Sequence, residues 1–213
     1  MNVKLQWATP NVDEQIMYIA RVSNPTNQNS GNTGLLRYCM KHGHVSPFEM
    51  ANACLEINTT RDIGRQILRH RSFSFQEFSQ RYADVSLIDD GNVVRECRMQ
   101  DTVNRQNSIE TNDLMLNSLW IQWQESTHSV ALTNYKAALK AGIAKEQARA
   151  LLPEGLTHSR MYMNGTIRSW VHYLQQRLDP STQKEHRQIA EGVLRELRVV
   201  APITMSAFFG EEQ

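Results

Sequence analysis

The sequence predicts an α+β fold for residues 1–213, mainly helical with a small antiparallel sheet and organised as a single domain. Two observations support this prediction. Apolar side chains alternate with polar ones at Val3, Leu5 and Trp7 and again along 51–57, which is the period of a half-buried strand. In most other segments apolar side chains recur every three or four residues, which is the spacing of one face of a helix.

The expected helices are separated by segments rich in Gly and Pro, including a loop at 23–34. Thr60-Arg61-Asp62 offers a helix start, and the period becomes that of an extended segment at Phe73 and Phe75. A surface excursion is expected at 86–105, with a turn at 89–92. The helices are expected at 13–22, 35–42, from 61 onward, 109–140 as one long amphipathic helix, 145–152, 165–177 and 181–199.

The charges nearly cancel, since 23 lysines and arginines face 22 aspartates and glutamates. A partner held by overall charge, such as nucleic acid, is therefore not expected. No apolar run is long enough to span a membrane, and the first residues lack the apolar stretch of a secretory signal. We therefore expect no membrane partner and a cytoplasmic location.

Three widely spaced cysteines, Cys39, Cys54 and Cys97, form no Cys-x-x-Cys pair, so reduced thiols are expected. Cys39 with His42 and His44 has a spacing that suits a metal ion, but a fourth ligand is missing from the sequence. The alternative for His42 is the end of a helix that is capped by the following glycine. No metal site is predicted.

The segment 69–82, RHRSFSFQEFSQRY, places arginines and serines among aromatic rings. Arginine donates paired hydrogen bonds to phosphate, and Gln66 shares the expected helical face with Arg69. A solvated helix face with surface ion pairs is the simplest alternative. The interleaved phenylalanines instead indicate partial burial, and buried arginines require anionic partners. The segment therefore predicts a site for a small anion such as a nucleotide.

A later set of polar residues comprises Arg149, the segment 164–172 and Arg177. Arg168 and His172 are four residues apart and share one face of the expected helix. Taken alone, Arg149 and Arg177 are as typical of a surface or an interface as of a ligand site. A lone histidine on such a helix is more often structural than catalytic.

Arg69-His70-Arg71, followed after seven residues by Ser79 and then Gln80-Arg81-Tyr82, resembles the signature of flavin-dependent thymidylate synthases. The resemblance extends over nearly the whole chain. The other matching segments are Ala20-Arg21-Val22-Ser23-Asn24-Pro25, Gly43-His44-Val45-Ser46-Pro47-Phe48-Glu49, Arg149-Ala150-Leu151-Leu152-Pro153 and the expected helix 164–177, in the family's order. Gln76 departs from the pattern, since an asparagine is expected there.

The resemblance implies methylation of dUMP to dTMP, with methylenetetrahydrofolate as donor and NADPH as reductant through tightly bound FAD. It also implies a homotetramer with active sites shared between subunits. By match to the family's motif positions, dUMP is held by Gln66, Arg69, Glu77, Ser79, Gln80 and Arg81, with Arg149 and Arg177 from another subunit. FAD is contacted by Ser46, Arg69, His70, Arg71, Glu77, Asn164, Arg168 and His172, with His44 and Glu49 close to it.

The catalytic residues implied by the resemblance are Arg177 and Ser79. Arg177 matches the position assigned to ionisation of uracil N3, where a cation raises electron density at C5. The Pro-Cys-His motif of classical thymidylate synthases is missing from the sequence, so no cysteine nucleophile is expected. Ser79 is expected to polarise or orient the base, because a serine nucleophile needs an adjacent general base.

Two other functions remain open at this stage. A single-stranded nucleic-acid module could use the Arg, His and Phe side chains for stacking and phosphate contacts, with strongly salt-dependent binding. A family member that binds FAD without turnover is the second alternative.

Overall fold

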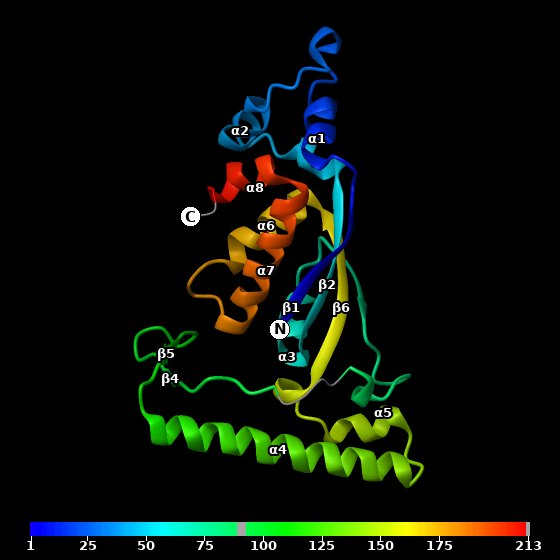
Figure 1. Cartoon of the computed structure of the whole chain (residues 1–213), viewed down its shortest axis with the longest axis vertical. Helices are drawn as coiled ribbons and strands as arrows, with labels where there is room; N and C mark the ends of the chain where they lie inside the picture. The colour runs from blue at the N-terminus through cyan, green and yellow to red at the C-terminus, as the bar shows by residue number, and fades with distance from the viewer. Residues whose placement is uncertain (89–92, 212–213) are drawn as a thin grey trace.

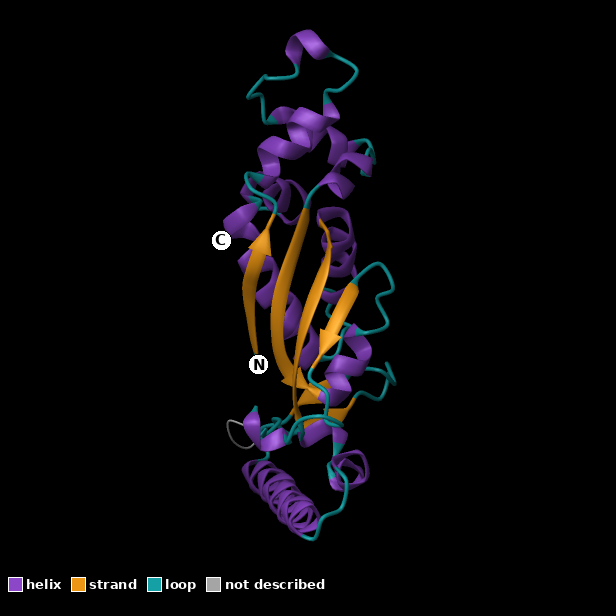
Figure 2. Ribbon diagram, turned by 90° about the vertical axis from the view of Figure 1, so that its right-hand side faces the viewer, coloured by secondary structure: helices purple, strands orange, loops and turns teal. Residues whose placement is uncertain are grey.

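The computed structural model describes residues 1–88 and 93–211. Its main sheet has four strands in the order β1 (Asn2–Ala8), β2 (Asn52–Thr60), β6 (His158–Thr166) and β3 (Ser74–Glu77), and every neighbouring pair is antiparallel. Helices α6 (Ile167–Arg177) and α7 (Lys184–Val200) lie against one face of this sheet (Figures 1 and 2). The predicted α+β fold is confirmed.

The main core lies between this sheet and the two helices. Strand β2 contributes Ala53, Leu55 and Ile57 to it, and each of these side chains is buried, as the alternating pattern predicted. Helix α7 presents Ile189, Ala190, Val193 and Leu197 at helical spacing, while α6 adds the fully buried Trp170. We call the four strands with α6 and α7 the core layer.

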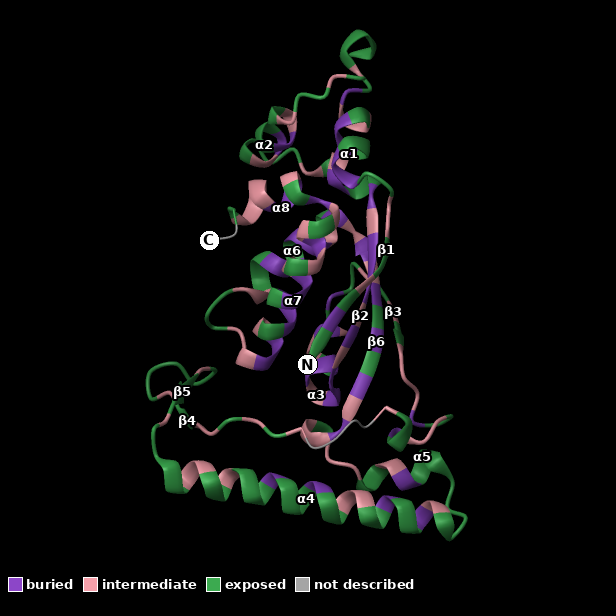
Figure 3. Ribbon diagram, in the orientation of Figure 1, coloured by how far each residue is buried: buried purple, intermediate pink, exposed green. Residues whose placement is uncertain are grey.

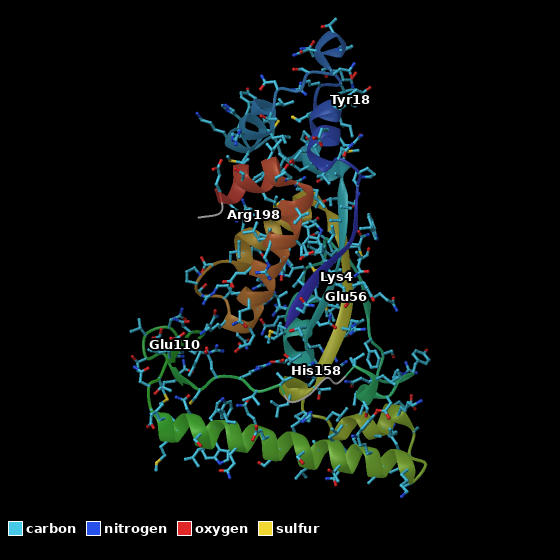
Figure 4. The ribbon with its side chains drawn as sticks, viewed as in Figure 1. Lys4, Tyr18, Glu56, Glu110, His158 and Arg198 are labelled. Atoms are coloured by element: carbon cyan, nitrogen blue, oxygen red, sulfur yellow. The ribbon has the colours of Figure 1, made fainter. Side chains whose placement is uncertain are left out.

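The other face of the sheet carries polar side chains. Lys4 and Glu56 lie opposite each other on β1 and β2 (Figure 4), and Glu56 accepts hydrogen bonds from Asn58 and from Tyr162 on β6. Hydrogen bonding by Asn58 and Tyr162, together with the charge of Arg160, keeps the pKa of Glu56 below its usual value although partial burial opposes this. An antiparallel sheet with one covered face and one solvated face is the common arrangement.

The last strand of the core layer in chain order, β6, was not predicted. Its buried positions are occupied by Ser159, Met161, Met163 and Gly165, none of which is a β-branched or aromatic residue that signals a strand. The helix expected at 165–177 therefore starts later, at Ile167. Thr166 caps it by accepting a hydrogen bond from the backbone N–H of Ser169.

Three further helices pack at one end of the core layer: α1 (Val12–Ala20), α2 (Gly34–Lys41) and α8 (Pro202–Phe209). The helices predicted at 13–22 and 35–42 are confirmed. Helix α3 (Arg61–Ile67) starts after Thr60 as predicted but ends before Arg69. The helical face that Gln66 was expected to share with Arg69 therefore does not extend to Arg69. Short 3-10 helices lie at Pro25–Asn27, Ser46–Met50, Val85–Leu87, Arg149–Leu151 and Glu154–Leu156.

At the opposite end, α4 (Leu114–Lys140) crosses the molecule, and α5 (Lys145–Ala148) folds back on it (Figure 1). The long helix was predicted, but it starts at Leu114 because β5 (Ser108–Glu110) pairs with β4 (Arg98–Gln100) before it. The helix predicted at 145–152 is α-helical only over α5. Helix α4 ends at Lys140 as predicted, since Gly142 just beyond it adopts a φ of 84°. Residues 114–151 are called the α4 arm.

The apolar side of α4 does not face the rest of the chain. Its buried residues are Gln124, His128, Tyr135 and Ala138, most of them polar, whereas the exposed apolar residues Met115, Leu119, Trp123 and Val130 form a stripe on a different side of the helix. Figure 3 shows α4 mostly exposed. The predicted amphipathic helix is thus present with its apolar stripe turned outward.

Two arginines help to anchor the excursion predicted at 86–105. Arg95 donates to Asp62 at 2.7 Å and 2.8 Å, and Arg98 donates to Glu185 at 2.6 Å. The expected turn at 89–92 lies outside the described residues. In the part of the chain that the structure describes, no helix combines the length and the apolar character needed to cross a membrane.

Candidate active site

The Arg-His-Arg triplet lies just beyond the end of α3, where it meets the last turn of α6. Arg69 and Arg71 are exposed, whereas His70 is buried and accepts a 2.9 Å hydrogen bond at Nε2 from Nε of Arg177. Burial, followed by the charges of Arg177 and His172, lowers the pKa of His70 to about 4. The triplet therefore presents two exposed cations beside a neutral imidazole and a third arginine.

Arg177 was expected to reach this cluster from another subunit. The contact with His70 brings it to the cluster within a single chain. Its Nε is occupied by His70, so the two terminal guanidinium nitrogens are the groups that remain for a ligand.

Phe73 fixes the segment that follows the triplet. Its ring packs against Trp170 at a centroid distance of 4.6 Å and covers Gly165 of β6 so closely that any Cβ there would overlap the ring. Only glycine permits this approach. The triplet and β3 are therefore held at a set distance from the central strands.

Glu77 is held in place from two directions at the end of β3. Ser159 of β6 donates to Glu77 Oε1 at 2.7 Å, and Nη1 of the buried Arg61 lies 3.5 Å from the same oxygen. Its carboxylate is thereby oriented while its second oxygen stays available. Partly buried Ser79 and buried Gln80 follow directly, and Gln80 Nε2 has no hydrogen-bond partner among the described residues.

Arg81 and Arg149 both lie beside Glu146. Arg81 Nε is 3.6 Å from the Glu146 carboxylate, and Arg149 donates to the Glu146 backbone carbonyl at 3.3 Å. The structure thus joins Arg149 to the C-terminal part of the signature segment and Arg177 to its N-terminal part.

A pocket of about 520 Å³ opens between the Ser46–Met50 turn and α6. Its walls combine apolar and polar groups: Val45, Phe48, Glu49, Ser72, Arg168, Ser169, Val171, His172, Gln175 and Phe208. Arg168 and Glu49 form an ion pair at its edge, with both side chains about half exposed. Such a mixed lining suits a cofactor with a flat ring system and polar substituents.

The remaining residues that the resemblance assigned to FAD lie at several places. Ser46 and His44 are exposed beside the pocket's Val45, and the His44 ring is 5.9 Å from that of Tyr38. Asn164 lies on β6 rather than on a helix, and its Oδ1 is buried without a hydrogen-bond partner in the described part of the chain.

The metal alternative for Cys39, His42 and His44 gains no support. No group of three His, Cys, Asp or Glu side chains suited to a metal occurs within residues 1–88 and 93–211. Gly43 has a φ of 68° and ends α2, which confirms the capping interpretation. Cys54 is a free thiol buried on β2.

Sequence reasoning missed several polar residues around the site, namely Tyr173, Gln183, Glu185, His186 and Ser159. Ser159 belongs to the strand that was not predicted. His186 carried a usable signal, since it is three residues before Ile189 and four before Ala190, on the buried face of α7.

Comparison with known proteins matches the geometry to one family. The pattern of the family described as thymidylate synthase complementing protein matches residues 4–203. A flavin-dependent thymidylate synthase of Synechocystis sp. is 49% identical over 175 residues, covering 82% of this chain and 79% of that protein. A probable flavin-dependent thymidylate synthase of Paramecium bursaria Chlorella virus 1 is 47% identical over 180 residues, covering 84% and 82%.

A solved structure shares the fold. The UMP/dUMP methylase PolB from Streptomyces cacaoi, bound with 5-Br dUMP, superposes with a TM-score of 0.82 at 26% identity. The superposition covers 97% of this chain and 93% of that one.

Proposed function

Because this chain belongs to the flavin-dependent thymidylate synthase family, a family of methyltransferase enzymes, we propose that it converts dUMP to dTMP. We propose methylenetetrahydrofolate as the one-carbon donor, NADPH as the reductant and FAD as the bound cofactor. The observation that carries the proposal concerns two of the six buried side-chain polar atoms that lack partners among the described residues. Gln80 Nε2 and Asn164 Oδ1 stand at positions that the resemblance assigns to dUMP and to FAD, and buried polar groups are normally satisfied.

The residues present fit a flavin. The pocket beside α6 offers apolar walls, the Arg168 guanidinium and the Glu49 carboxylate, and Asn164 supplies a buried acceptor. We propose that these residues hold FAD, together with His44, Ser46, Arg69, His70, Arg71, Glu77 and His172. When bound, FAD supplies the hydride chemistry.

For dUMP, the proposed ligands are Gln66, Arg69, Glu77, Ser79, Gln80, Arg81, Arg149 and Arg177. The exposed arginines suit the phosphate, since guanidinium groups pair with its oxygens. The terminal nitrogens of Arg177 can stabilise negative charge that develops on the uracil imide, and neutral His70 holds that arginine in place. Ser79 is proposed to orient the base.

The two buried thiols of this chain, those of Cys39 and Cys54, do not suit nucleophilic attack on uracil. Burial raises the pKa of both Cys39 and Cys54, so each stays protonated at neutral pH. This agrees with activation of the base by the charge of Arg177.

We further propose that the enzyme is a homotetramer whose sites are shared between subunits. The outward stripe of Met115, Leu119, Trp123 and Val130 supports an interface on α4, because a helix rarely leaves such a stripe in water. Arg149, at the end of the α4 arm, would be positioned by that interface.

The test is NADPH oxidation coupled to dTMP formation by purified protein supplied with FAD, dUMP and methylenetetrahydrofolate, each omitted in turn. Product that depends on all four supports the proposal. No product with FAD still bound points to a family member without turnover. Strand binding without FAD points to the nucleic-acid module.

A matched pair of variants tests the role of Arg177. Arg177→Ala should reduce kcat/KM by about a hundredfold or more, since a charge aimed at the developing anion is lost. Arg187→Ala, on α7, removes an arginine that donates to the Pro180 carbonyl and should leave kcat/KM within about twofold. Equal activity of the two variants contradicts the assignment.

A further inference from the structure

A continuous series of polar side chains runs from the last turns of α6 to the start of α7, and the proposed reaction does not use most of it. His186 Nε2 lies 3.2 Å from the Tyr173 hydroxyl, and Nδ1 lies 3.1 Å from Gln66 Oε1. Gln66 Nε2 donates to Gln183 Oε1 at 2.7 Å, and Gln183 Nε2 donates to Glu185 Oε2 at 2.9 Å. We call these five residues the amide relay.

Glu185 sets the direction of every hydrogen bond in the amide relay. Its burial alone would raise the pKa, but hydrogen bonds from Gln183 and from Arg98 outweigh this and lower it. The carboxylate is thus ionised and accepts only. Gln183 must therefore turn its NH₂ group toward Glu185 and its oxygen toward Gln66.

The oxygen of Gln183 in turn fixes the orientation of the Gln66 amide. Its NH₂ group must face the Gln183 oxygen, so its own oxygen faces His186. If the Gln66 amide were flipped, its oxygen would face the oxygen of Gln183, and its NH₂ group would face His186. His186 must then carry its proton on Nδ1.

The environment of His186 keeps the ring neutral and selects this tautomer. The side chain is fully buried, and burial, followed by the charges of Arg177 and His70, lowers its pKa to about 3. With Nδ1 protonated, Nε2 accepts from the Tyr173 hydroxyl. Each donor of the relay thus points along the series toward Glu185.

Gln66 is left with one Nε2 hydrogen and one Oε1 lone pair, which together match a ligand group that both accepts and donates. We propose that His186 is a positioning residue that holds the side-chain amide of Gln66 in a single orientation for the nucleotide. The inference rests on the proposed function, in which Gln66 binds dUMP. Without His186, the amide keeps only the Gln183 anchor and can rotate away.

Two substitutions of equal shape separate this role from packing. In His186→Asn, the amide nitrogen falls near the position of imidazole Nδ1 and can still donate to Gln66. His186→Leu has the same branched shape without a hydrogen-bonding atom. Both variants lose the contact with Tyr173, so a difference in their dUMP affinity reports the hydrogen bond to Gln66.

With FAD-loaded protein, calorimetry should show that His186→Leu binds dUMP about threefold to tenfold more weakly than His186→Asn. KM for dUMP should rise by the same factor, with kcat less affected. In a Gln66→Leu background the two variants should bind dUMP equally. Equal affinities in the wild-type background, or a difference that persists without Gln66, overturn the inference.

A spectroscopic measurement on the unmodified protein keeps the inference testable if His186→Leu fails to fold. Long-range ¹H–¹⁵N spectra of histidine-labelled protein should show His186 as the neutral Nδ1–H tautomer at pH 6. The Nε2–H tautomer or a charged ring overturns the inference. If the wild-type protein does not bind dUMP but shows this tautomer, the proposed function fails while the relay stands.

Discussion

The core layer and the α4 arm place their large apolar side chains in opposite ways. Trp170 in the core layer is 0% exposed and donates its indole N–H to the Ala53 carbonyl at 3.1 Å. Trp123 in the α4 arm is 53% exposed. The α4 arm shares a small second core with the segment after β3, in which Tyr135, Ala138 and Ala148 of the arm are buried with Val85. The core layer therefore buries its large apolar side chains within the chain, whereas the α4 arm leaves a row of them exposed, as the proposed interface requires.

The largest expected effect comes from the core layer. Trp170→Ala should lower the free energy of unfolding by about 3–5 kcal/mol, because it opens a cavity beneath Phe73 and leaves the Ala53 carbonyl without its donor. Urea unfolding followed by circular dichroism measures this. A loss below about 1 kcal/mol would mean that this region is not the stable part of the molecule.

The next largest expected effect is on subunit association through the α4 arm. Trp123→Asp places a charge in the outward stripe and should weaken subunit association by about 2–4 kcal/mol, seen as smaller species in sedimentation velocity. The control Ser118→Asp puts the same charge on α4 outside the stripe and should leave the assembly size unchanged. Assembly that is insensitive to Trp123→Asp would contradict an interface there.

Acid should act on the core layer through two buried histidines. The folded-state pKa values of His70 and His186, about 4 and about 3, lie below the ordinary value of 6.5. The unfolded chain then binds more protons below pH 6.5, so stability is full above that pH and falls as the pH decreases. Between pH 6.5 and 5 the loss should be about 1–2 kcal/mol per histidine, measured by urea unfolding.

His186→Asn removes one of the two titrating groups and should flatten this pH dependence by about half. A slope unchanged by the substitution would show that other groups cause the acid sensitivity.

The smallest expected effect lies at the end of α4. Gly142 has a φ of 84°, so Gly142→Ala should cost about 1 kcal/mol through backbone strain. Gly31→Ala, where the added Cβ meets no atom within 4 Å and φ is not positive, serves as the control. Thermal unfolding of both variants shows whether the substitution at Gly142 lowers stability while the one at Gly31 does not.

Sequence patterns predicted the elements whose side chains match their environment. Strand β2 buries Ala53, Leu55 and Ile57 as its alternating pattern predicted, but in β1 the alternation is interrupted by a bulge after Leu5 that leaves Trp7 50% exposed. Gly43 and Gly142 mark the ends of α2 and α4 as glycines with positive φ. The patterns failed where packing overrode propensity. Strand β6 buries Ser159 and Gly165 because Glu77 and the Phe73 ring need small neighbours there, and this requirement is visible only in three dimensions.

The candidate site likewise contains residues that the sequence predicted and residues that it did not. The signature segment around His70 was identified from residue types and spacing, because its chemistry depends on neighbours in the chain. The amide relay joins Gln66 to residues more than a hundred positions later, so no local pattern could reveal it. Likewise, the stripe on α4 predicted an amphipathic helix without revealing that it faces outward.

The contact between Phe73 and Gly165 has a consequence for local motion. Strand β3 has only four residues and pairs with a single neighbour, β6, which would ordinarily let it open readily. Because the Phe73 ring is seated over Gly165 and against Trp170, opening must first withdraw the ring from the interior. The amide hydrogens of β3 that bond to β6 should therefore exchange with solvent as slowly as those of the central strands, and the arginines before β3 should keep their spacing while ligands bind and leave.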